Sequence, residues 1–425
     1  MRRYDLYKDS GINWVHEIPL NWEIDSIGKV MVERSVKVSD TEYPPLSVTK
    51  NGIVPQLEGV AKTDNNDNRK LVCSGDFVIN SRSDRKGSSG YSNLTGSVSV
   101  INIVLEPTKL FPLYTNYLFK SYLFIEEFFR NGKGIVMDLW STRWNEMRYM
   151  KIPLPPLSEQ QQIVSYLDTK TSLIDSLIEK TKLKIQLLKE NRTSLINEVV
   201  TKGLNPNVEM KDSGVEWIGE IPKGWGLTKI KYEFIISGGG TPSKDNLDYW
   251  NGDIPWVSPK DMKSKFISKT EDYVTLEGIK NSSTKLIQDK SLLMVVRSGI
   301  LQHSIPVCFN SVPVSINQDL KSFEEKKDMG INYLYYFIKG HEKNLLLEWS
   351  KDGTTVESIE MGFMLNSEIP LPPHSEQLQI VSYLDEHTQL IDKTISVEER
   401  RIELLKEYRQ SLISEVVTGK RKVLN

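Results

Sequence analysis

The sequence predicts an α+β fold with two β-rich domains separated by an antiparallel coiled coil of two long helices. Three observations support this prediction: a long segment that occurs twice, an apolar seam of heptad spacing within each copy, and short β-branched runs outside the copies. The repeat gives the chain an approximate internal two-fold symmetry. With 425 residues, of which 39% are hydrophobic, the chain can bury one large core or two to three ordinary ones.

The duplicated segment covers about fifty residues in each half of the chain. IPLPPLSEQQQIVSYLDTKTSLID, which starts at Ile152, returns at Ile369 as IPLPPHSEQLQIVSYLDEHTQLID. The similarity continues from Leu187, where LLKENRTSLINEVVT matches LLKEYRQSLISEVVT from Leu404. Roughly two thirds of the aligned positions are identical, which is far beyond chance self-similarity.

A shorter repeat precedes each long one and divides the chain into blocks. KDSGINWVHEIPLNW, from Lys8, matches KDSGVEWIGEIPKGW, from Lys211. Each half therefore consists of a short motif, a variable block of about 130 or 145 residues, and the long repeat, and each variable block has the size of one domain. The predicted segments are a first variable domain at 1–151, a first long helix at 152–204, a second variable domain at 205–368 and a second long helix at 369–425.

Both copies of the long repeat carry the signals of a helix. Prolines precede Ser158 and Ser375, which are candidate N-caps, and Gln161 completes a capping box in the first copy. Gly203 and Gly419 follow the last periodic residues, where helices commonly end in glycine. We therefore expect one uninterrupted helix in each copy.

Apolar residues recur along both predicted helices at alternating steps of three and four, which is the spacing of a coiled-coil seam. Arg192 and Arg409 interrupt the seam, where they either fix the register of the pair or extend to solvent. The predicted interface consists of Val164, Leu167, Ile174, Ile178, Ile185, Leu188, Leu195 and Val199 in the first helix, and Val381, Leu384, Ile391, Ile395, Ile402, Leu405, Leu412 and Val416 in the second.

Chain connectivity favours an antiparallel pair. Such a pair brings the end of the first helix, near Thr201, close to the start of the second, near Ser375. A parallel pair would require the second variable block to span the whole rod, about 66 Å at 1.5 Å per residue. The alternative is that each helix packs only on its own domain, but the narrow seams favour mutual pairing.

The variable blocks have the composition of β-rich α+β domains. Short strands are indicated by LVCSGDFVINS from Leu71, GSVSVINIVL from Gly96 and LLMVVRSGI from Leu292, which Gly, Asn and Asp residues interrupt. Aromatic residues at helical spacing predict shorter helices from Leu113 and from Ile331, and we expect these aromatic residues to be core.

Composition and motifs narrow the class of function. The net charge of -2 argues against a uniformly basic coat protein, although basic residues could still line one groove. The sequence has no phosphate-binding GxxxxGK[ST] loop, no Asn-Pro-Pro-Tyr or Asp-Pro-Pro-Tyr motif and no HExxH pair. Its five histidines, and Cys73 and Cys308, lack metal-ligand spacing, so we expect neither catalytic nor metal-binding residues. The absence of a long apolar run predicts a cytoplasmic protein without membrane contact.

Several motifs together resemble one known family. GGGTPSKDNLDYWNGDIPWVSPKDM from Gly238, SINQDLKSF from Ser315 and the repeated IPLPPxSEQxQIVSYLD resemble specificity subunits of type I restriction-modification systems. The likeness covers nearly the whole chain. The first block departs from the second with PPLSVTKNGIVPQ from Pro44 and GDFVINSRSDRKGSSGYSNLTGSVS from Gly75, which look like another variety of recognition domain.

This resemblance implies a DNA specificity subunit that is not itself an enzyme. Each of its two target-recognition domains would read one half of a bipartite site in double-stranded DNA, and the helical spacer would fix the gap. Because the two blocks differ, the halves of the site should differ as well. Two modification subunits and the restriction subunits of a prokaryotic complex would assemble on the chain. Those partners, rather than this chain, would use S-adenosylmethionine, ATP and Mg.

Side-chain chemistry selects candidate DNA contacts, because Arg and Lys bind phosphates or guanine edges and Asn or Gln can pair with adenine. For each candidate a solvated surface charge is the simpler alternative, and Asn317 and Gln318 could instead bond buried backbone groups. The candidates are Lys50, Arg82, Arg85, Lys86 and Asn93 in the first block, and Lys244, Lys260, Lys263, Arg297, Asn317 and Gln318 in the second.

Two other classes of function remain as alternatives. A coiled-coil scaffold that binds only proteins would show no salt-dependent binding to duplex DNA. An unrecognised nuclease would cleave DNA on its own in the presence of a metal ion.

Overall fold

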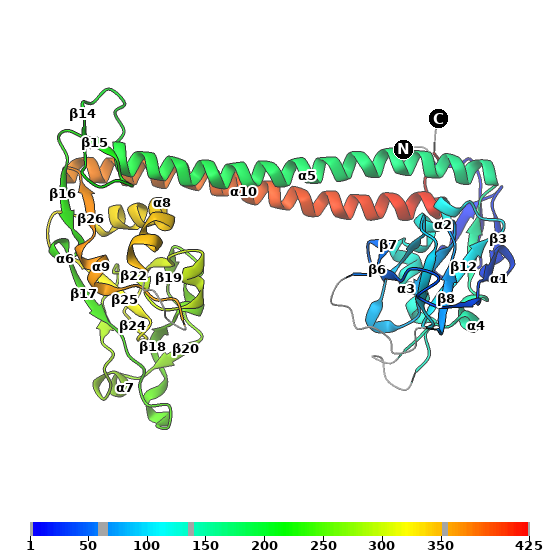
Figure 1. Ribbon diagram of the computed structural model, residues 1–425, viewed down its shortest axis with the longest axis horizontal. Coiled ribbons are helices and arrows are strands. Elements are labelled where there is room, and N and C mark those ends of the chain that lie inside the picture. The colour runs from blue at the N-terminus through cyan, green and yellow to red at the C-terminus, as the bar shows by residue number, and fades with distance from the viewer. Residues whose placement is uncertain (1–2, 58–66, 135–139, 351–355, 424–425) are drawn as a thin grey trace. The chain divides into compact units, whose positions relative to one another are not determined.

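The computed structural model describes residues 3–57, 67–134, 140–350 and 356–423, and it divides into two compact units (Figure 1). Unit 1 comprises Met1–Lys182 and Glu399–Asn425, and unit 2 comprises Leu183–Glu398. Each unit contains part of both long helices, α5 (Leu157–Lys202) and α10 (His374–Val417). This division cuts through the helices, whereas the sequence analysis treated each helix as a segment of its own.

Unit 1 is built on a four-stranded antiparallel sheet in the order β10-β9-β12-β4. A hairpin, β1-β2, precedes this sheet, and β3 pairs with β13 just before α5 begins. The elements are β1 (Tyr7–Asp9), β2 (Glu17–Pro19), β3 (Glu23–Ser26), α1 (Ile27–Val30), β4 (Met31–Glu33), β9 (Phe77–Asn80), β10 (Ser89–Tyr91), β12 (Asn102–Pro107), α2 (Pro112–Phe119), α3 (Tyr122–Arg130), α4 (Trp144–Met147) and β13 (Lys151–Leu154).

A second antiparallel sheet of unit 1, in the order β11-β8-β5, and the hairpin β6-β7 come mainly from the chain between β4 and β9. Their core is a separate small cluster that includes Leu46, Val72 and Val98. The elements are β5 (Lys37–Val38), β6 (Leu46–Thr49), β7 (Gly52–Pro55), β8 (Arg69–Val72), η1 (Ser83–Arg85) and β11 (Gly96–Ser99).

Unit 2 has a corresponding main sheet of five strands in the order β17-β25-β22-β23-β19. It also begins with a hairpin, β14-β15, and β16 pairs with β26 just before α10. The elements are β14 (Met210–Asp212), β15 (Glu220–Pro222), β16 (Gly226–Lys229), α6 (Ile230–Glu233), β17 (Phe234–Gly238), β19 (Phe266–Ile267), β22 (Leu292–Val295), β23 (Val307–Asn310), β25 (Leu320–Glu325), α8 (Ile331–Trp349), α9 (Met361–Asn366) and β26 (Glu368–Leu371).

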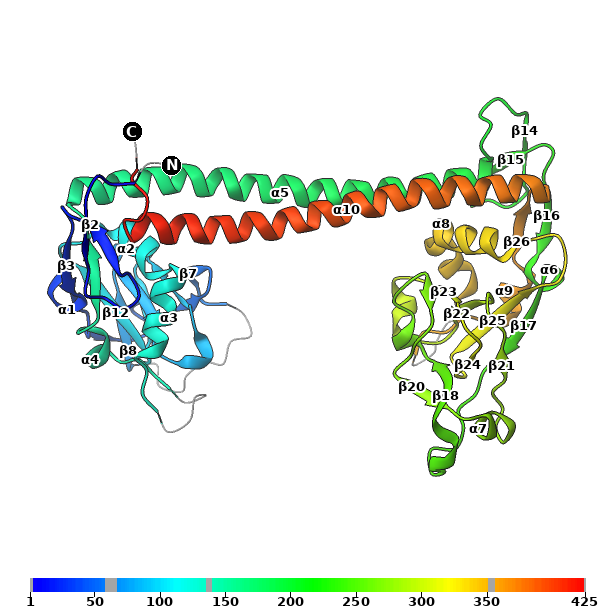
Figure 2. The same cartoon turned by 180° about the vertical axis from the view of Figure 1, so that it is seen from behind.

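The second sheet of unit 2 has the order β20-β18-β24-β21, and β18 runs parallel to β24. Within this unit, α8 lies next to the long helices, whereas β18, β20 and α7 lie on the side farthest from α10 (Figures 1 and 2). The elements are η3 (Leu247–Tyr249), β18 (Trp250–Val257), η4 (Pro259–Asp261), β20 (Asp272–Val274), α7 (Leu276–Lys280), β21 (Leu286–Ile287), η5 (Gly299–Gln302) and β24 (Val314–Ile316).

The main sheets of the two units share one frame. Strands β4, β9, β10 and β12 have the same order and pairing as β17, β22, β23 and β25, and in both units the chain then passes through a helix to the strand before the long helix. The second sheets do not share this correspondence, because β11 pairs antiparallel with β8 whereas β24 pairs parallel with β18. The α+β prediction is therefore confirmed, and the frame common to both blocks is a finding that the sequence analysis did not anticipate.

The long helices run antiparallel in unit 2, because Lys184 of α5 contacts Glu398 of α10 while Arg192, farther along α5, contacts Asp392, which is nearer the start of α10. In unit 1 the N-terminal segment joins the first turn of α5 to the residues that follow α10, since Tyr4 donates to Glu159 and lies under the amine of Lys422.

All sixteen predicted seam residues are buried or half-buried within their units. Leu412 and Val416 lie in the same core cluster of unit 1 as Ile163 and Leu167, and in unit 2 Val199 clusters with Leu384. The two interrupting arginines pair across the seam in equivalent ways. Arg409 Nε lies 2.9 Å from Asp175 Oδ1, and Arg192 Nε lies 2.9 Å from Asp392 Oδ1.

Both units dock onto the long helices through repeated contacts. In unit 1, Tyr117 donates to Asp168 at 2.6 Å and Tyr114 donates to the carbonyl of Val417 at 3.3 Å. The same contacts recur in unit 2, where the donors are Tyr336 and Tyr333. Their acceptors are Asp385, at 2.5 Å, and the carbonyl of Val200, at 2.7 Å.

The predicted helix starts were wrong in detail. α5 already includes Leu157, and the amides of Glu159 and Gln160 bond to the carbonyl of Pro156, so Ser158 lies inside the helix rather than at its cap. Ser375 is likewise inside α10. The predicted ends are confirmed, because Gly203 and Gly419 have φ values of 77° and 75° in the left-handed region that favours glycine.

The buried side chain of Gln160 replaces the predicted capping box. It accepts from the amide of Phe111 at 2.7 Å and donates to the carbonyl of Pro155 at 2.9 Å. Gln377 repeats this arrangement in unit 2, with the amide of Gly330 and the carbonyl of Pro372. These glutamines join the start of each long helix to the residue before α2 in unit 1 and before α8 in unit 2.

Most aromatic residues of the shorter helices are core, as predicted, and Phe119, Phe124, Tyr333 and Phe337 are almost fully buried, but Tyr122 is 58% exposed. The segment from Leu113 forms two helices, because the chain bends between α2 and α3 at the N-cap serine of α3. Among the helices that the structure describes, none is long and apolar enough to cross a membrane.

Candidate nucleic-acid interface

An exposed arginine follows the corresponding inner strand of the main sheet in both units. β9 ends at Asn80 and the chain continues to Arg82, which forms a single β-bridge with Ser141. In unit 2, β22 ends at Val295, and Arg297 forms the same type of bridge with Ser358. Both arginines are exposed, and both were candidates from the sequence.

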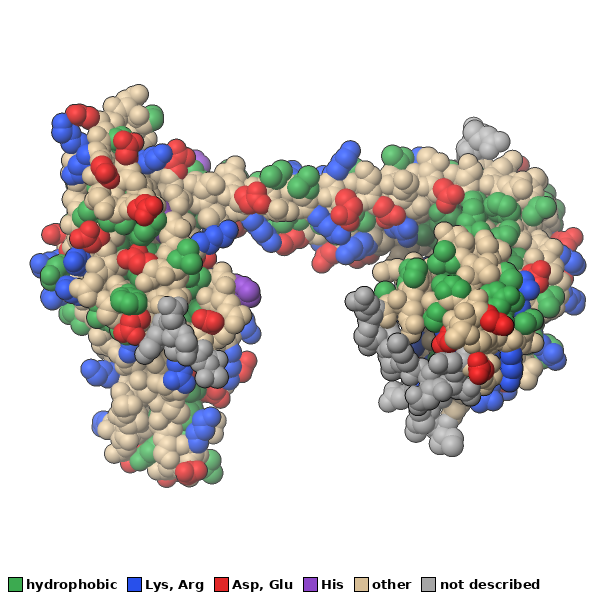
Figure 3. Space-filling model, viewed as in Figure 1, with side chains coloured by type: hydrophobic (Ala, Val, Ile, Leu, Met, Phe, Trp, Pro, Cys, Tyr) green, Lys and Arg blue, Asp and Glu red, His purple; other side chains and the backbone are tan. Residues whose placement is uncertain are grey.

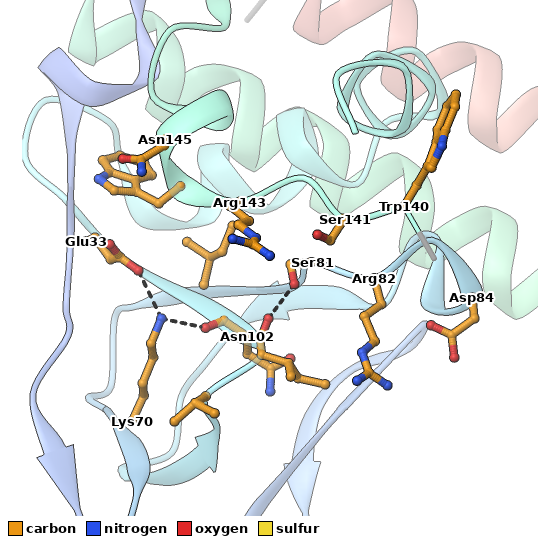
Figure 4. A pocket seen from close by; sticks show the side chains of 14 residues that line it. Glu33, Lys70, Ser81, Arg82, Asp84, Asn102, Trp140, Ser141, Arg143 and Asn145 are labelled. Atoms are coloured by element: carbon orange, nitrogen blue, oxygen red, sulfur yellow. Dashed lines mark hydrogen bonds and ion pairs between the residues drawn. The ribbon is translucent and has the colours of Figure 1, made fainter. Parts of the chain in front are cut away.

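In unit 1, Arg82 lines a pocket of about 650 Å³ (Figure 4). Arg143 and Trp140 contribute from the segment before α4. On the floor of the pocket, Lys70 donates to Glu33 Oε1 and to the carbonyl of Asn102, both at 2.9 Å. Cations, an amide and an indole thus surround one concavity, which is the mixture of side chains that can hold a phosphate or a base edge.

The other candidates of unit 1 do not meet in this pocket. Lys50 lies in the turn of the β6-β7 hairpin, and exposed Asn93 lies between β10 and β11. Arg85 is exposed on η1, with its Nε 3.5 Å from Asp84 Oδ2. Lys86 is less available, because its amine donates to Glu126 at 2.7 Å and lies 4.4 Å from the ring centroid of Phe129.

In unit 2 a glycine-rich loop follows β17 and packs against the end of β24 in the second sheet. A Cβ added to Gly239 would lie 2.1 Å from the carbonyl oxygen of Ile316, so only glycine allows this approach. The amide of Gly240 bonds to the same carbonyl at 3.0 Å, and Trp256 Nε1 donates to the carbonyl of Gly240 at 3.0 Å. The glycines therefore allow this loop to approach the backbone of β24 closely.

Two neighbouring candidates, Gln318 and Asn317, have different settings. Gln318 is exposed beside this loop, and Thr241 donates to its Oε1 at 2.6 Å. Asn317 is only 5% exposed, and both polar atoms of its side chain bond to Asp319. Asn317 thus holds Asp319 in place, which is the structural alternative to a DNA contact. Asp319 Oδ1 in turn lies 3.3 Å from Arg297 Nε.

The lysine candidates of unit 2 also differ in availability. Lys244 and Lys263 are exposed, on the loop before η3 and just after η4. Lys260 Nζ lies 2.7 Å from Glu271 and 3.1 Å from Asp272, and hydrogen bonds to these carboxylates raise its pKa above the ordinary value. Lys260 is therefore a charge already compensated by its own unit.

Positive charge is dispersed on the face shown in Figure 3, where Lys and Arg side chains alternate with Asp and Glu. Recognition would then depend on individual side chains at the sheet edges rather than on one large basic patch. Within residues 3–57, 67–134, 140–350 and 356–423, no group of three or more His, Cys, Asp or Glu side chains could hold a metal ion.

Sequence reasoning missed part of the unit 1 pocket. Lys70, Asn102, Trp140 and Arg143 line it but were not among the candidates. The run WSTRW, at 140–144, interleaves aromatic and basic residues, a pattern that often accompanies nucleic-acid binding and that could have identified this segment. For Lys70 and Asn102, which lie in strands, no sequence signal marks the pocket.

The family model for the type I restriction modification DNA specificity domain matches this chain twice, at residues 21–187 and 222–407. Together these matches cover more than half of the chain. The chain belongs to this family. The resemblance stated from its motifs is therefore confirmed, and each copy of the specificity domain includes one variable block and much of one long helix.

Curated relatives of this specificity-domain protein are specificity subunits. It is 34% identical over 264 residues to the EcoR124I/EcoR124II specificity subunit of Escherichia coli, an alignment that covers 60% of this chain but only 59% of the relative. It is 23% identical to the MjaVIII specificity subunit of Methanocaldococcus jannaschii, with 99% and 98% of the two chains covered.

Solved structures share the fold of this specificity-domain protein. A chain from a study of assembly and conformational transition in the type I R-M system has a TM-score of 0.74 and 17% identity, with 94% and 98% of the two chains covered. The HsdS subunit from Thermoanaerobacter tengcongensis has a TM-score of 0.58 and 18% identity, with 95% and 98% covered.

Proposed function

We propose that this chain is the DNA-reading subunit of a type I restriction-modification complex, and that units 1 and 2 read the two unlike halves of one bipartite site in double-stranded DNA. The observation that carries the proposal is the shared frame with dissimilar second sheets. A frame that repeats can present two readers in equivalent ways, while unlike sheets and edge loops give each reader its own sequence preference.

The helices α5 and α10 would act as the spacer of the bipartite site. Each helix begins in one unit and ends in the other, so the chain offers a continuous helical connection rather than a flexible linker. A helix of 46 residues is about 69 Å long at 1.5 Å per residue. A spacer of this kind would make the gap between the half-sites a fixed number of base pairs.

The modification and restriction subunits would supply the chemistry. Because the exposed faces of the helices repeat with the two-fold duplication, we propose that two modification subunits bind, one to each repeat. S-adenosylmethionine, ATP and Mg would be used by these partners, and this chain would bind none of them and catalyse no step. The complex would act in the prokaryotic cytoplasm.

Mapping of methylated adenines in cells with and without the gene tests this function. We expect an asymmetric two-part motif with a constant gap that disappears with the gene. A symmetric motif, or no change in methylation, would contradict the proposal.

Binding and cleavage assays separate the alternatives. The protein, assembled with its modification subunits, should bind the mapped duplex in a salt-dependent manner, whereas a scaffold for proteins alone would not. Cleavage of DNA by the purified chain with a divalent metal would favour a nuclease instead.

A further inference from the structure

We infer that Arg82 and Arg297 are a matched pair of phosphate contacts, one per half-site, which fix how each unit lies on the duplex and do not read bases. This inference rests on the proposed DNA-reading function. The two arginines occupy the same place in the shared frame, although they lie in variable blocks whose sequences show little similarity.

The backbone establishes the equivalence of the two positions. On either side of the bridge between Arg82 and Ser141, the amide of Ser83 bonds to the carbonyl of Trp140 and the amide of Thr142 bonds to that of Ser81, both at 2.9 Å. Each bond has a counterpart in unit 2.

There, the amide of Ser298 bonds to the carbonyl of Glu357 at 3.0 Å, and the amide of Ile359 bonds to that of Val296 at 2.8 Å. Arg297 and Ser358 form the bridge between them. Both arginines therefore project from a backbone position that is fixed by hydrogen bonds on two strands.

The neighbouring positions differ between the units. The register of these bonds aligns Arg85 with Ile300 and Arg143 with Glu360, so a basic side chain in unit 1 corresponds to an apolar or acidic one in unit 2. Of the charged side chains, only the bridge arginine is the same. Two serines also correspond, because Ser83 aligns with Ser298 and the bridge partner Ser141 aligns with Ser358. A residue that is kept while its surroundings change suits a feature common to both half-sites, and the phosphate backbone is common to all sequences.

Both guanidinium groups are accessible to a phosphate. Arg82 is exposed, and the side chain of Arg297 is 60% exposed. The carboxylate of Asp319, whose side chain is 20% exposed, lies 3.3 Å from Arg297 Nε, while the rest of the guanidinium remains open to a phosphate. Arginine also forms two parallel hydrogen bonds to phosphate, which helps to set orientation as well as affinity.

The test compares Arg82→Ala, Arg297→Ala and the double variant, each assembled with its modification subunits. Binding is measured over a range of salt concentrations to the target duplex found by adenine mapping, and to duplexes with single base changes in either half. We expect each single variant to lower the slope of log K against log salt by about 1, and the double variant by about 2. The ranking of the base-substituted duplexes should not change.

Matched variants control for folding and for the loss of any arginine. Arg130→Ala removes a side chain that is 65% exposed but lies on α3, and it should leave the slope unchanged. Arg82→Lys and Arg297→Lys keep the positive charge, and they should restore most of the slope that alanine removes.

Each other outcome has a defined meaning. If the wild-type complex does not bind the duplex, the proposed function itself fails. If the wild type binds and the alanine variants bind equally well, or if either variant relaxes the preference at one base pair of a half-site, the assignment of these arginines to phosphates is wrong while the proposed function stands.

Discussion

Units 1 and 2 share the parts that hold them to the long helices and differ in the parts farther from them. Tyr117 and Tyr336 bond to equivalent aspartates of the long helices, and Gln160 and Gln377 bridge equivalent loops. By contrast, the strand pairing β11-β8 is antiparallel and β18-β24 is parallel. The comparison indicates that the contacts to the long helices are common to both units, whereas the strand pairing of the second sheets is not.

The largest expected effect concerns Trp22 and Trp225, which end the two copies of the short repeat. Trp22 and Trp225 are 0% and 2% exposed, and Trp225 Nε1 also donates to Glu376 at 2.9 Å. Replacing either with alanine should cost about 3 to 5 kcal/mol in its own unit. Because Trp225→Ala also removes a hydrogen bond, it should cost about 1 kcal/mol more than Trp22→Ala. Hydrogen exchange measured along the chain reports the stability of each unit separately. An equal loss of amide protection in both units would contradict the comparison.

A difference in pH dependence should follow from His341, which is 3% exposed at a kink in α8. Its Nδ1 accepts from Asn197 at 3.0 Å and its Nε2 donates to Thr201 at 3.0 Å, which fits the neutral ring. Burial lowers its pKa from the ordinary value of 6.5 to about 4. The unfolded chain therefore binds the proton more readily than the folded chain does.

Stability from this histidine should be fully present above pH 6.5 and should be lost as the pH falls toward 4. The total loss is on the order of 3 kcal/mol, confined to unit 2. Hydrogen exchange at a series of pH values should show this slope in the wild type and a smaller slope in His341→Gln. An unchanged slope in the variant would show that other groups cause the acid sensitivity.

A smaller effect should distinguish the glycine loop of unit 2. Alanine at Gly239 would place its Cβ 2.1 Å from the carbonyl oxygen of Ile316, so the loop must move, and we expect a cost of about 1 to 3 kcal/mol. Gly299→Ala is the control, because nothing lies within 4 Å of its added Cβ. Methylation by complexes with Gly239→Ala is measured on targets that carry base changes in one half. Discrimination against altered bases should fall only in the half-site read by unit 2. Equal effects on both half-sites would contradict separate readers.

The smallest expected effect is a weak coupling within two equivalent ion pairs, which should be of similar size in both units. Arg192–Asp392 and Arg409–Asp175 are partly exposed ion pairs in equivalent positions of the helix seam. Double-mutant cycles should give a coupling of about 0.2 to 1 kcal/mol for each pair, with the two values close to each other. A coupling present in one pair and absent in the other would mean that the two halves of the seam are not equivalent in solution.

The sequence predicted the helices and their seam because the repeat and the heptad spacing are strong, local patterns. It did not predict the shared frame, because equivalence there rests on hydrogen-bond register between residues such as Arg82 and Ser141 that are far apart in the chain. Helix starts were misplaced because the buried amide of Gln160, and not Ser158, organises the first turn of α5.

Candidate contacts could be chosen by chemical type but not by availability. Arg82 and Arg297 are exposed after equivalent inner strands, whereas Lys86 and Lys260 are held by carboxylates of their own units. Asn317 is buried in a turn. Whether a charged side chain is compensated depends on neighbours distant in sequence, and only the fold reveals those neighbours.

An exchange of whole variable blocks tests the central claim most directly. Residues 23–151 are replaced by residues 226–368, so that both units carry the block of unit 2 between unchanged repeats, and methylated adenines are mapped in cells that express this chain. The account predicts a new target in which both halves match the half formerly read by unit 2. Persistence of the original asymmetric target would contradict it.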